Sequence, residues 1–430
     1  MPVAVVHPHH RLNQRQENKM ISKKFHVIVS GILLVCMFAR AQRYPTYKGL
    51  VMAGYQGWFN TPGDSAGRGW HHYEKRGVFQ PGSCEIDFWP DVSEYKKTYT
   101  TAFSFADGRP ASVFSPHDAS TVYLHFKWMK DYGIDGVFMQ RFVAEIRNPS
   151  GKKHFNTVLD NAVKAATKYD RAIAVMYDLS GMRPGEEELV LKDLDELTGR
   201  YDLLHGSKSP TYLHHNGKPF IVIWGVGFND HRVYGLKEAE TLLDAMKARG
   251  FSVMLGVPSY WRELRQDAIS DEGLHRLIKK SDVIMPWFVG RYNGKSYDGF
   301  KHLVADDIAW CKNNGVDYVP LAFPGFSWKN MNGPRANTIP REGGSFYWRQ
   351  IAGAKNAGAE MLYVAMFDEM NEGTSIFKCA TEDKLPLNAG GSFTGIETSL
   401  GSDYYLWLTG QAARWFHGKG KYSDQLPVRK

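Results

Sequence analysis

Three carboxylates lie close together in the sequence, directly after an apolar run. Residues 361–367 are uninterrupted apolar side chains, and Asp368, Glu369 and Glu372 follow them before Gly373. An apolar run of this length is typical of a strand that is buried on both faces. Carboxylates at the end of such a strand lose hydration and raise one another's pKa, so they are costly to keep. Two of them, Glu369 and Glu372, have the residue type that a general acid and a base or nucleophile require.

The spacing of the two glutamates sets the expected chemistry. Glu369 and Glu372 are three residues apart, so a tight turn decides the distance between their carboxyl groups. We expect two crowded glutamates to differ in pKa, with one still protonated near neutral pH. Asp368 alternates to the opposite side of the strand, and we interpret it as a structural residue that holds a helix or an arginine. A purely structural cluster, in which Asp368 or Asn371 caps the next segment, is the alternative.

The rest of the chain predicts the elements that position these residues. Apolar runs that predict buried strands occur at residues 50–59, 136–142, 172–178, 219–224, 252–257, 282–287, 318–323 and 361–367. Amphipathic stretches predict helices at residues 120–132, 157–169, 186–197, 237–249, 273–280, 300–313, 344–357 and 404–416. This alternation predicts an α/β fold with a parallel sheet, and eight units in this length favour a single (β/α)8 TIM-type barrel. A doubly wound open sheet is the alternative, but no Gly-x-Gly-x-x-Gly follows the first run.

The connection between the first strand and the first helix is unusually long. It contains Trp70-His71-His72-Tyr73 and the acidic, aromatic stretch at residues 85–95. A connection of this length inside a compact domain is usually functional. We therefore expect an extended first strand-to-helix loop that contributes to a site.

The C-terminal ends of the strands in a parallel barrel meet at one rim, where ligands bind. Aromatic rings, amides and a few charges gather there around the expected catalytic pair, Glu369 and Glu372, and this mixture suits a carbohydrate. Each aromatic residue taken alone could equally be part of the core. The expected substrate-binding residues are Tyr55, Gln56, Trp58, Trp70, His71, Gln140, Arg141, Tyr177, Asp178, Trp224, Trp287, Tyr292, Trp328 and Asn371.

Charge and cysteine content limit the function classes. The chain has a formal charge of +8, but residues 1–41 hold six of its 53 basic residues and one of its 45 acidic residues, which leaves about +3. No basic run with interleaved aromatics is present, so nucleic acid is not expected as a partner. After residue 41 the cysteines are Cys84, Cys311 and Cys379, an odd number that allows at most one intrachain disulfide. Their spacing does not resemble a zinc site, and we expect no bound metal.

Residues 20–41 have the pattern of a secretory signal. Lys23 and Lys24 precede a short apolar core, and Ala39-Arg40-Ala41 provides a small-x-small cleavage pattern. Lipoprotein processing at Cys36 is a weaker alternative, because Val35 stands where a small residue is normally required. We expect residues 1–41 to be leader and signal, with cleavage near Ala41, and residues 42–430 to be one catalytic domain. After removal of the signal we expect no membrane span. We also expect the protein to be a monomer.

Here a resemblance to a known family becomes specific. The sequence Phe367-Asp-Glu-Met-Asn-Glu-Gly-Thr374 resembles the Asn-Glu-Trp-His-Glu-Gly-Thr signature of glycoside hydrolase family 99. It also resembles the wider group that includes family 71 and, more distantly, WbsX-like proteins. The Trp70-His71-His72 loop, Ile86-Asp-Phe-Trp-Pro-Asp91 and the order of the strands are similar to that group, so the resemblance covers most of residues 50–416.

The resemblance implies a retaining glycosidase on a (β/α)8 barrel that needs no organic cofactor. In family 99 one glutamate deprotonates the sugar 2-hydroxyl to form a 1,2-anhydro ring, and a second acts as acid and then base. On this chain the resemblance assigns these roles to Glu369 and Glu372. The chain departs from the family at Met370-Asn371, where Trp-His is usual, and at Gln140-Arg141-Phe142, where a tryptophan ends the second strand.

The sequence predicts an exported glycoside hydrolase that acts on a polysaccharide or oligosaccharide, with α-mannan or a pentose-containing glycan as alternative substrates. A non-catalytic glycan-binding barrel is one alternative function, suggested by the changed residues between the glutamates. A WbsX-like glycosyltransferase is another, but an exported protein would lack a supply of nucleotide sugars.

Overall fold

The computed structural model describes Met1, residues 42–333 and residues 338–429. The expected leader and signal fall on residues 2–41, outside the described residues, and remain a prediction together with the boundary at residue 42. Arg43–Lys430 form one compact unit. Within the part of the chain that the structure describes, no helix combines the length and apolar character needed to cross a bilayer.

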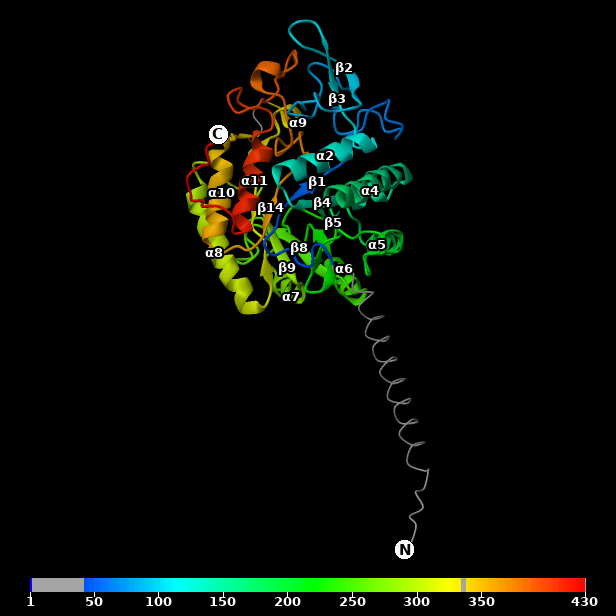
Figure 1. Cartoon of the computed structure of the whole chain (residues 1–430), viewed down its shortest axis with the longest axis vertical. Coiled ribbons are helices and arrows are strands. Elements are labelled where there is room, and N and C mark those ends of the chain that lie inside the picture. The colour runs from blue at the N-terminus through cyan, green and yellow to red at the C-terminus, as the bar shows by residue number, and fades with distance from the viewer. Residues whose placement is uncertain (2–41, 334–337, 430) are drawn as a thin grey trace. The chain divides into compact units, whose positions relative to one another are not determined.

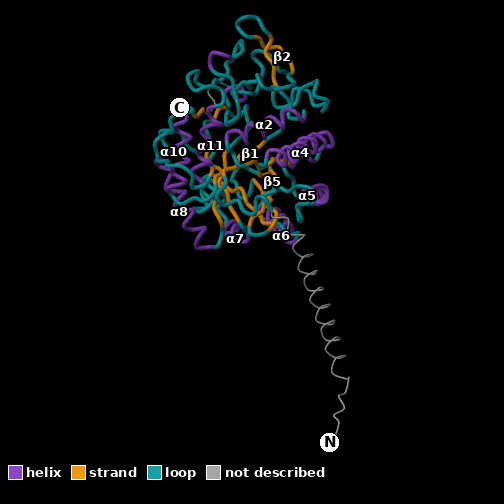
Figure 2. Tube along the Cα trace, in the orientation of Figure 1, coloured by secondary structure: helices purple, strands orange, loops and turns teal. Residues whose placement is uncertain are grey.

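A parallel barrel forms the centre of this unit (Figures 1 and 2). Its strands are β1 (Val51–Tyr55), β4 (Gly136–Phe142), β5 (Ala172–Asp178), β7 (Lys218–Trp224), β8 (Ser252–Pro258), β9 (Val283–Trp287), β10 (Asp317–Tyr318), β11 (Leu321–Ala322) and β14 (Leu362–Val364). β1 pairs with both β4 and β14. β10 pairs with β9 and β11 pairs with β14, and both belong to one stretch of chain, so the sheet closes on itself. The predicted (β/α)8 barrel is therefore confirmed.

Helices follow the strands and cover the outside of the barrel (Figure 1). They are α2 (Ala119–Tyr132), α3 (Val143–Ile146), α4 (Pro149–Tyr169), α5 (Glu187–Tyr201), α6 (Leu236–Ala248), α7 (Gly273–Lys280), α8 (Tyr297–Asn314), α10 (Ser345–Asn356) and α11 (Tyr404–Phe416). The predicted helices are confirmed, but α4 begins eight residues earlier than expected. Pro149 explains this start, because proline fits the first helical position, where no N–H donor is needed.

Three predicted strands are much shorter than their apolar runs, and the first of them, β1, ends at Tyr55. The run at residues 318–323 is divided between β10 and β11, because Pro320 has no N–H to donate to the ladder. Its carbonyl oxygen still accepts a hydrogen bond from the Tyr363 amide at 3.0 Å. The run at residues 361–367 is a regular strand only in β14. Beyond it the Phe367 amide still donates to the Gly54 carbonyl at 2.7 Å, so the chain stays beside β1 up to the carboxylates.

The long first loop contains a hairpin that the sequence analysis missed. β2 (Tyr99–Ser104) pairs antiparallel with β3 (Pro110–Val113). The turn includes Asp107 and Gly108, and Gly108 has a φ of 83°. Asp-Gly between alternating β-formers is a strong hairpin signal and could have predicted this element. Shorter elements complete the fold: β6 (His214–His215), β12 (Phe326–Ser327), β13 (Thr338–Ile339), α9 (Lys329–Asn332), η1 (Glu342–Gly344) and η2 (Glu382–Lys384).

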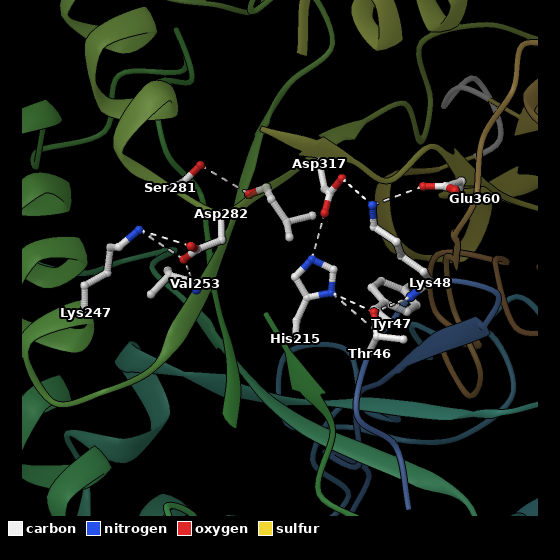
Figure 3. A network of polar contacts seen from close by, with 11 residues as sticks. Thr46, Tyr47, Lys48, His215, Lys247, Val253, Ser281, Asp282, Asp317 and Glu360 are labelled. Carbon is white, nitrogen blue, oxygen red and sulfur yellow. Dashed lines mark hydrogen bonds and ion pairs between the residues drawn. The ribbon is translucent and has the colours of Figure 1, made fainter. Parts of the chain in front are cut away.

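A polar network ties together segments that precede several strands (Figure 3). The fully buried His215 contacts Asp317 through Nε2 at 2.9 Å. Lys48 bridges Asp317 and Glu360 at 3.0 and 3.2 Å. These residues lie just before or at the start of β1, β7, β10 and β14, at the N-terminal end of the barrel, where structural contacts usually serve stability.

We expect Asp317→Asn to destabilise the fold by about 1–3 kcal/mol at pH 7, because it removes an ionised acceptor from a partly buried network. Burial alone would raise the pKa of Asp317, but hydrogen bonds from His215 and Lys48 hold it below the ordinary value of 3.8. The carboxylate therefore stabilises the fold above pH 3.8, and this contribution is lost as the pH falls through the lower pKa of the folded state. Urea unfolding at pH 7 and near pH 3 measures both effects; equal stabilities of variant and wild type at pH 7 would contradict the prediction.

Candidate active site

A cavity of about 360 Å³ lies at the C-terminal ends of the barrel strands. Gln56 and Trp58 reach it from the end of β1, Gln140 from β4 and Asp178 from β5. The full lining is Gln56, Trp58, His72, Gln140, Phe142, Ala144, Glu145, Met176, Asp178, Ser180, Trp224, Trp287, Met366, Glu369 and Glu372. Both expected catalytic glutamates are thus on the wall of one cavity, at the rim where parallel barrels carry their sites.

The structure brings only part of the expected binding set to this cavity. The expected substrate-binding residues that line it are Gln56, Trp58, Gln140, Asp178, Trp224 and Trp287. The expected residues that do not line it are Tyr55, Trp70, His71, Arg141, Tyr177, Tyr292, Trp328 and Asn371.

Strand alternation explains why several of these residues point elsewhere. Gln140 faces the cavity, so the next residue on β4, Arg141, faces outward and binds the buried Asp193 of α5. Tyr177 on β5 also donates to Asp193, at 2.8 Å. Tyr55 contacts His125 Nδ1 through its hydroxyl at 2.8 Å, and Tyr292 donates to Gln350 at 3.1 Å. These four side chains hold strands and helices together.

Seven lining residues were missing from the sequence prediction. They are His72, Phe142, Ala144, Glu145, Met176, Ser180 and Met366. A signal was available for some of them: Phe142 and Met176 lie two residues from Gln140 and Asp178 on the same faces of their strands. Glu145 comes from α3, directly after β4, and its one-turn length gave no periodicity to detect.

Glu369 is held at both carboxyl oxygens. Gln56 Nε2 donates to Oε1 at 2.7 Å, and Thr374 Oγ1 donates to Oε2 at 3.0 Å. Its side chain is almost completely buried, whereas Glu372 is half-buried. The two carboxyl groups therefore share a cavity but differ in their surroundings.

The two glutamates titrate as an interacting pair. Burial, followed by the charge of Glu372, holds the pKa of Glu369 well above its usual range, although Thr374 and Gln56 oppose this shift. Burial raises the pKa of Glu372 to about 7, and the indole of Trp328 partly counteracts it. Trp328 Nε1 nevertheless makes no hydrogen bond of standard geometry. The pair as a whole keeps a proton near neutral pH.

Asp368 connects the last barrel strand to the first. Its two carboxyl oxygens accept hydrogen bonds from the Gln56 and Gly57 backbone amides at 2.7 and 2.9 Å. Its partner is thus the loop after β1, not the helix or arginine that the sequence suggested. This contact fixes the backbone of Gln56, whose side chain supports Glu369.

Polar atoms without partners lie among the lining residues. Within the described chain, Trp58 Nε1, Trp224 Nε1, Gln56 Oε1 and Gln140 Oε1 are buried and make no hydrogen bond. Buried polar atoms are normally paired, so such a set at a cavity indicates where a ligand can supply hydrogen bonds. Two are donors and two are acceptors, and a hydroxyl group can satisfy either kind.

Solved structures that share the fold of this chain include two of a family 99 enzyme. The family 99 endo-α-mannosidase from Bacteroides thetaiotaomicron in complex with BIS-TRIS-propane has a TM-score of 0.63 and 16% sequence identity, and the match covers 87% of this chain and 99% of that one. A second structure of the endo-α-mannosidase from Bacteroides thetaiotaomicron has a TM-score of 0.64 and 15% identity, with the same coverage. No protein-family model matches the chain, and no curated protein matches it in sequence. The resemblance to family 99 is therefore confirmed in the fold.

We expect the protein to lose stability as the pH rises from about 4.5 to about 7, because Glu372 keeps its proton in the folded state up to about pH 7 and releases it near 4.5 when unfolded. Because the pKa of Glu372 is higher in the folded state, the stability that its bound proton adds to the fold is fully present below pH 4.5 and is lost above about pH 7. In Glu372→Gln this part of the loss, roughly 1–3 kcal/mol, should disappear. Urea unfolding between pH 4.5 and 8 measures it, and parallel pH profiles for wild type and variant would refute it.

Proposed function

We propose that this protein is a glycoside hydrolase that cleaves glycosidic bonds in a polysaccharide or oligosaccharide. The observation that carries the proposal is that Glu369 and Glu372 line one cavity at the C-terminal end of the barrel. Glycoside hydrolysis uses two carboxyl groups, one to protonate the leaving oxygen and one to act as base or nucleophile. The cavity volume of about 360 Å³ suits a small number of sugar rings.

The surroundings of the glutamates support different roles for them. Gln56 and Thr374 hold both oxygens of Glu369 in fixed positions, which suits a base aimed at the sugar 2-hydroxyl. Because burial and the charge of Glu372 raise the pKa of Glu369, it acts as this base only once the pair has released its proton. Glu372 is more accessible and has a pKa of about 7, which suits an acid that protonates the leaving group and then activates water. This division agrees with the roles that the sequence resemblance implies, and the reaction then retains configuration at the anomeric carbon.

Two classes of glycan are proposed as the substrate. The neighbours in fold are endo-α-mannosidases, which favours α-mannan, whereas Gln140 and Phe142 at the end of β4 form a wall different from the family's tryptophan. A pentose-containing glycan is therefore the second substrate to test. The signal pattern of residues 20–41 supports export, so the proposed enzyme acts outside the cytoplasm. We propose that it acts as a monomer, that its substrate is a carbohydrate, and that hydrolysis needs no cofactor.

We expect Glu369→Gln and Glu372→Gln each to lower kcat by about 100-fold or more on a glycan that the wild type cleaves, because each removes a proton-transfer group while keeping its shape. Product chromatography after incubation with α-mannans, pentose-containing glycans and host-type oligosaccharides measures the loss. Glu240→Gln is the matched control, because Glu240 is exposed and paired with Lys280 on the outer helices.

Full activity in both cavity variants would refute the assignment of the glutamates. If the wild type binds an oligosaccharide in the cavity but leaves it intact after long incubation, the protein is a glycan-binding barrel and the proposed hydrolysis is wrong.

A further inference from the structure

A second cluster of reactive side chains adjoins the carboxylate pair. His71 and His72 come from the long loop after β1, and Glu145 comes from α3 after β4. One ligand atom from each residue lies within 4.8 Å of the others. His71 Nε2 is 3.1 Å from Glu145 Oε1. Two imidazoles and one carboxylate form a donor set that zinc commonly takes in proteins.

The surrounding residues hold the cluster in place. Arg68 Nη2 donates to Glu145 Oε2 at 2.6 Å, which orients the carboxylate and leaves Oε1 turned toward His71. The His72 ring stacks on Trp58, with centroids 3.8 Å apart and planes 11° apart. A neighbouring polar group that orients a ligand is typical of protein metal sites.

The backbone at His72 is also unusual. Its φ is 62°, in the left-handed region that non-glycine residues rarely adopt. Such conformations persist where the surrounding structure enforces them, and they concentrate at functional sites. The loop holds His72 in this conformation while its ring stacks on Trp58, and both residues line the cavity.

The cluster of His71, His72 and Glu145 is accessible from solvent and borders the cavity. His71 is 31% exposed, so solvent reaches the cluster. His72 and Glu145 line the same cavity as Glu369. With three protein ligands, a tetrahedral ion keeps one free coordination position.

We propose that His71, His72 and Glu145 bind one divalent transition-metal ion, Zn²⁺ by ligand type, in the wall of the cavity. Ligand atoms around tetrahedral zinc lie roughly 3.4 Å apart, so the side chains need to rotate inward slightly. No metal was expected from the sequence, because the cysteine spacing does not fit a zinc site and nothing in the sequence pairs the two histidines with the distant Glu145. The alternative is a closed Arg68–Glu145–His71 ion-pair network that binds no ion.

Metal content and affinity test this proposal without any glycan. The full chain, prepared without a histidine tag and stripped with a chelator, is titrated with Zn²⁺ in a calorimeter and with Co²⁺ in a spectrophotometer. We expect one site whose Co²⁺ form shows the intense visible bands of tetrahedral coordination. Zn²⁺ should also raise the melting temperature. Absence of the tetrahedral spectrum, together with no zinc-dependent stabilisation, would overturn the proposal.

Variants locate the site. His71→Gln and Glu145→Gln should each weaken Zn²⁺ binding by at least about tenfold. His205→Ala is the matched control, because His205 is exposed and contacts a carboxylate, that of Asp202, elsewhere on the surface. The histidines of residues 1–41 are present in every variant, so they cannot produce the difference. Circular dichroism in chelator shows whether each variant is folded, and equal affinities in folded wild type and variants would place any bound zinc elsewhere and refute the site.

Discussion

The arrangement of the site depends on the hydrogen bonds that Asp368 accepts from the backbone after β1. Regular pairing between β1 and β14 ends at the pair Ala53 and Val364. Beyond it, Asp368 binds the amides of Gln56 and Gly57, so the ends of the first and last strands stay together although the ladder has stopped. Because Gln56 then supports Glu369, one buried carboxylate sets the position of another. Burial raises the pKa of Asp368 to about 7, because the charged carboxylate loses hydration there, and the two amide hydrogen bonds only partly offset this.

The two ends of the barrel carry opposite electrostatic balances. At the C-terminal end, Asp368, Glu369 and Glu372 all have raised pKa values, because burial disfavours their charged forms. At the N-terminal end, Asp317 has a lowered pKa, because its charged form is hydrogen-bonded by His215 and Lys48. At neutral pH the carboxyl groups at the C-terminal end therefore lower the stability of the fold, whereas Asp317 at the N-terminal end raises it. This division is expected of a protein that keeps reactive groups in a cavity and places stabilising contacts away from it.

The sequence predicted the barrel well because its signals are long and repeated. Buried parallel strands read as apolar runs, and each of the long covering helices has an apolar face of helical period, so small errors at one element did not change the fold. The cavity was harder to predict. At the end of β4, Gln140 and Arg141 were equally polar candidates, and only the direction of the strand distinguishes the cavity-facing Gln140 from Arg141, which pairs with Asp193. His72 was missed because it lies in irregular chain, and Glu145 was missed because α3 is a single turn, so neither segment has a period to indicate direction.

Trp58 lines the cavity, but its ring faces are already covered by other side chains of the protein. Its indole was expected to offer a flat face to a sugar, but one face is stacked on His72 and the other lies against Phe142 at 5.0 Å. Its N–H is buried and unpaired, as are that of Trp224 and the amide oxygens of Gln56 and Gln140. Donors and acceptors in fixed positions discriminate strongly, because a ligand that lacks the matching hydroxyl leaves them buried and unpaired. If the protein is the proposed hydrolase, we therefore expect its choice between sugars to depend mainly on the pattern of their hydroxyl groups and less on the breadth of their apolar faces.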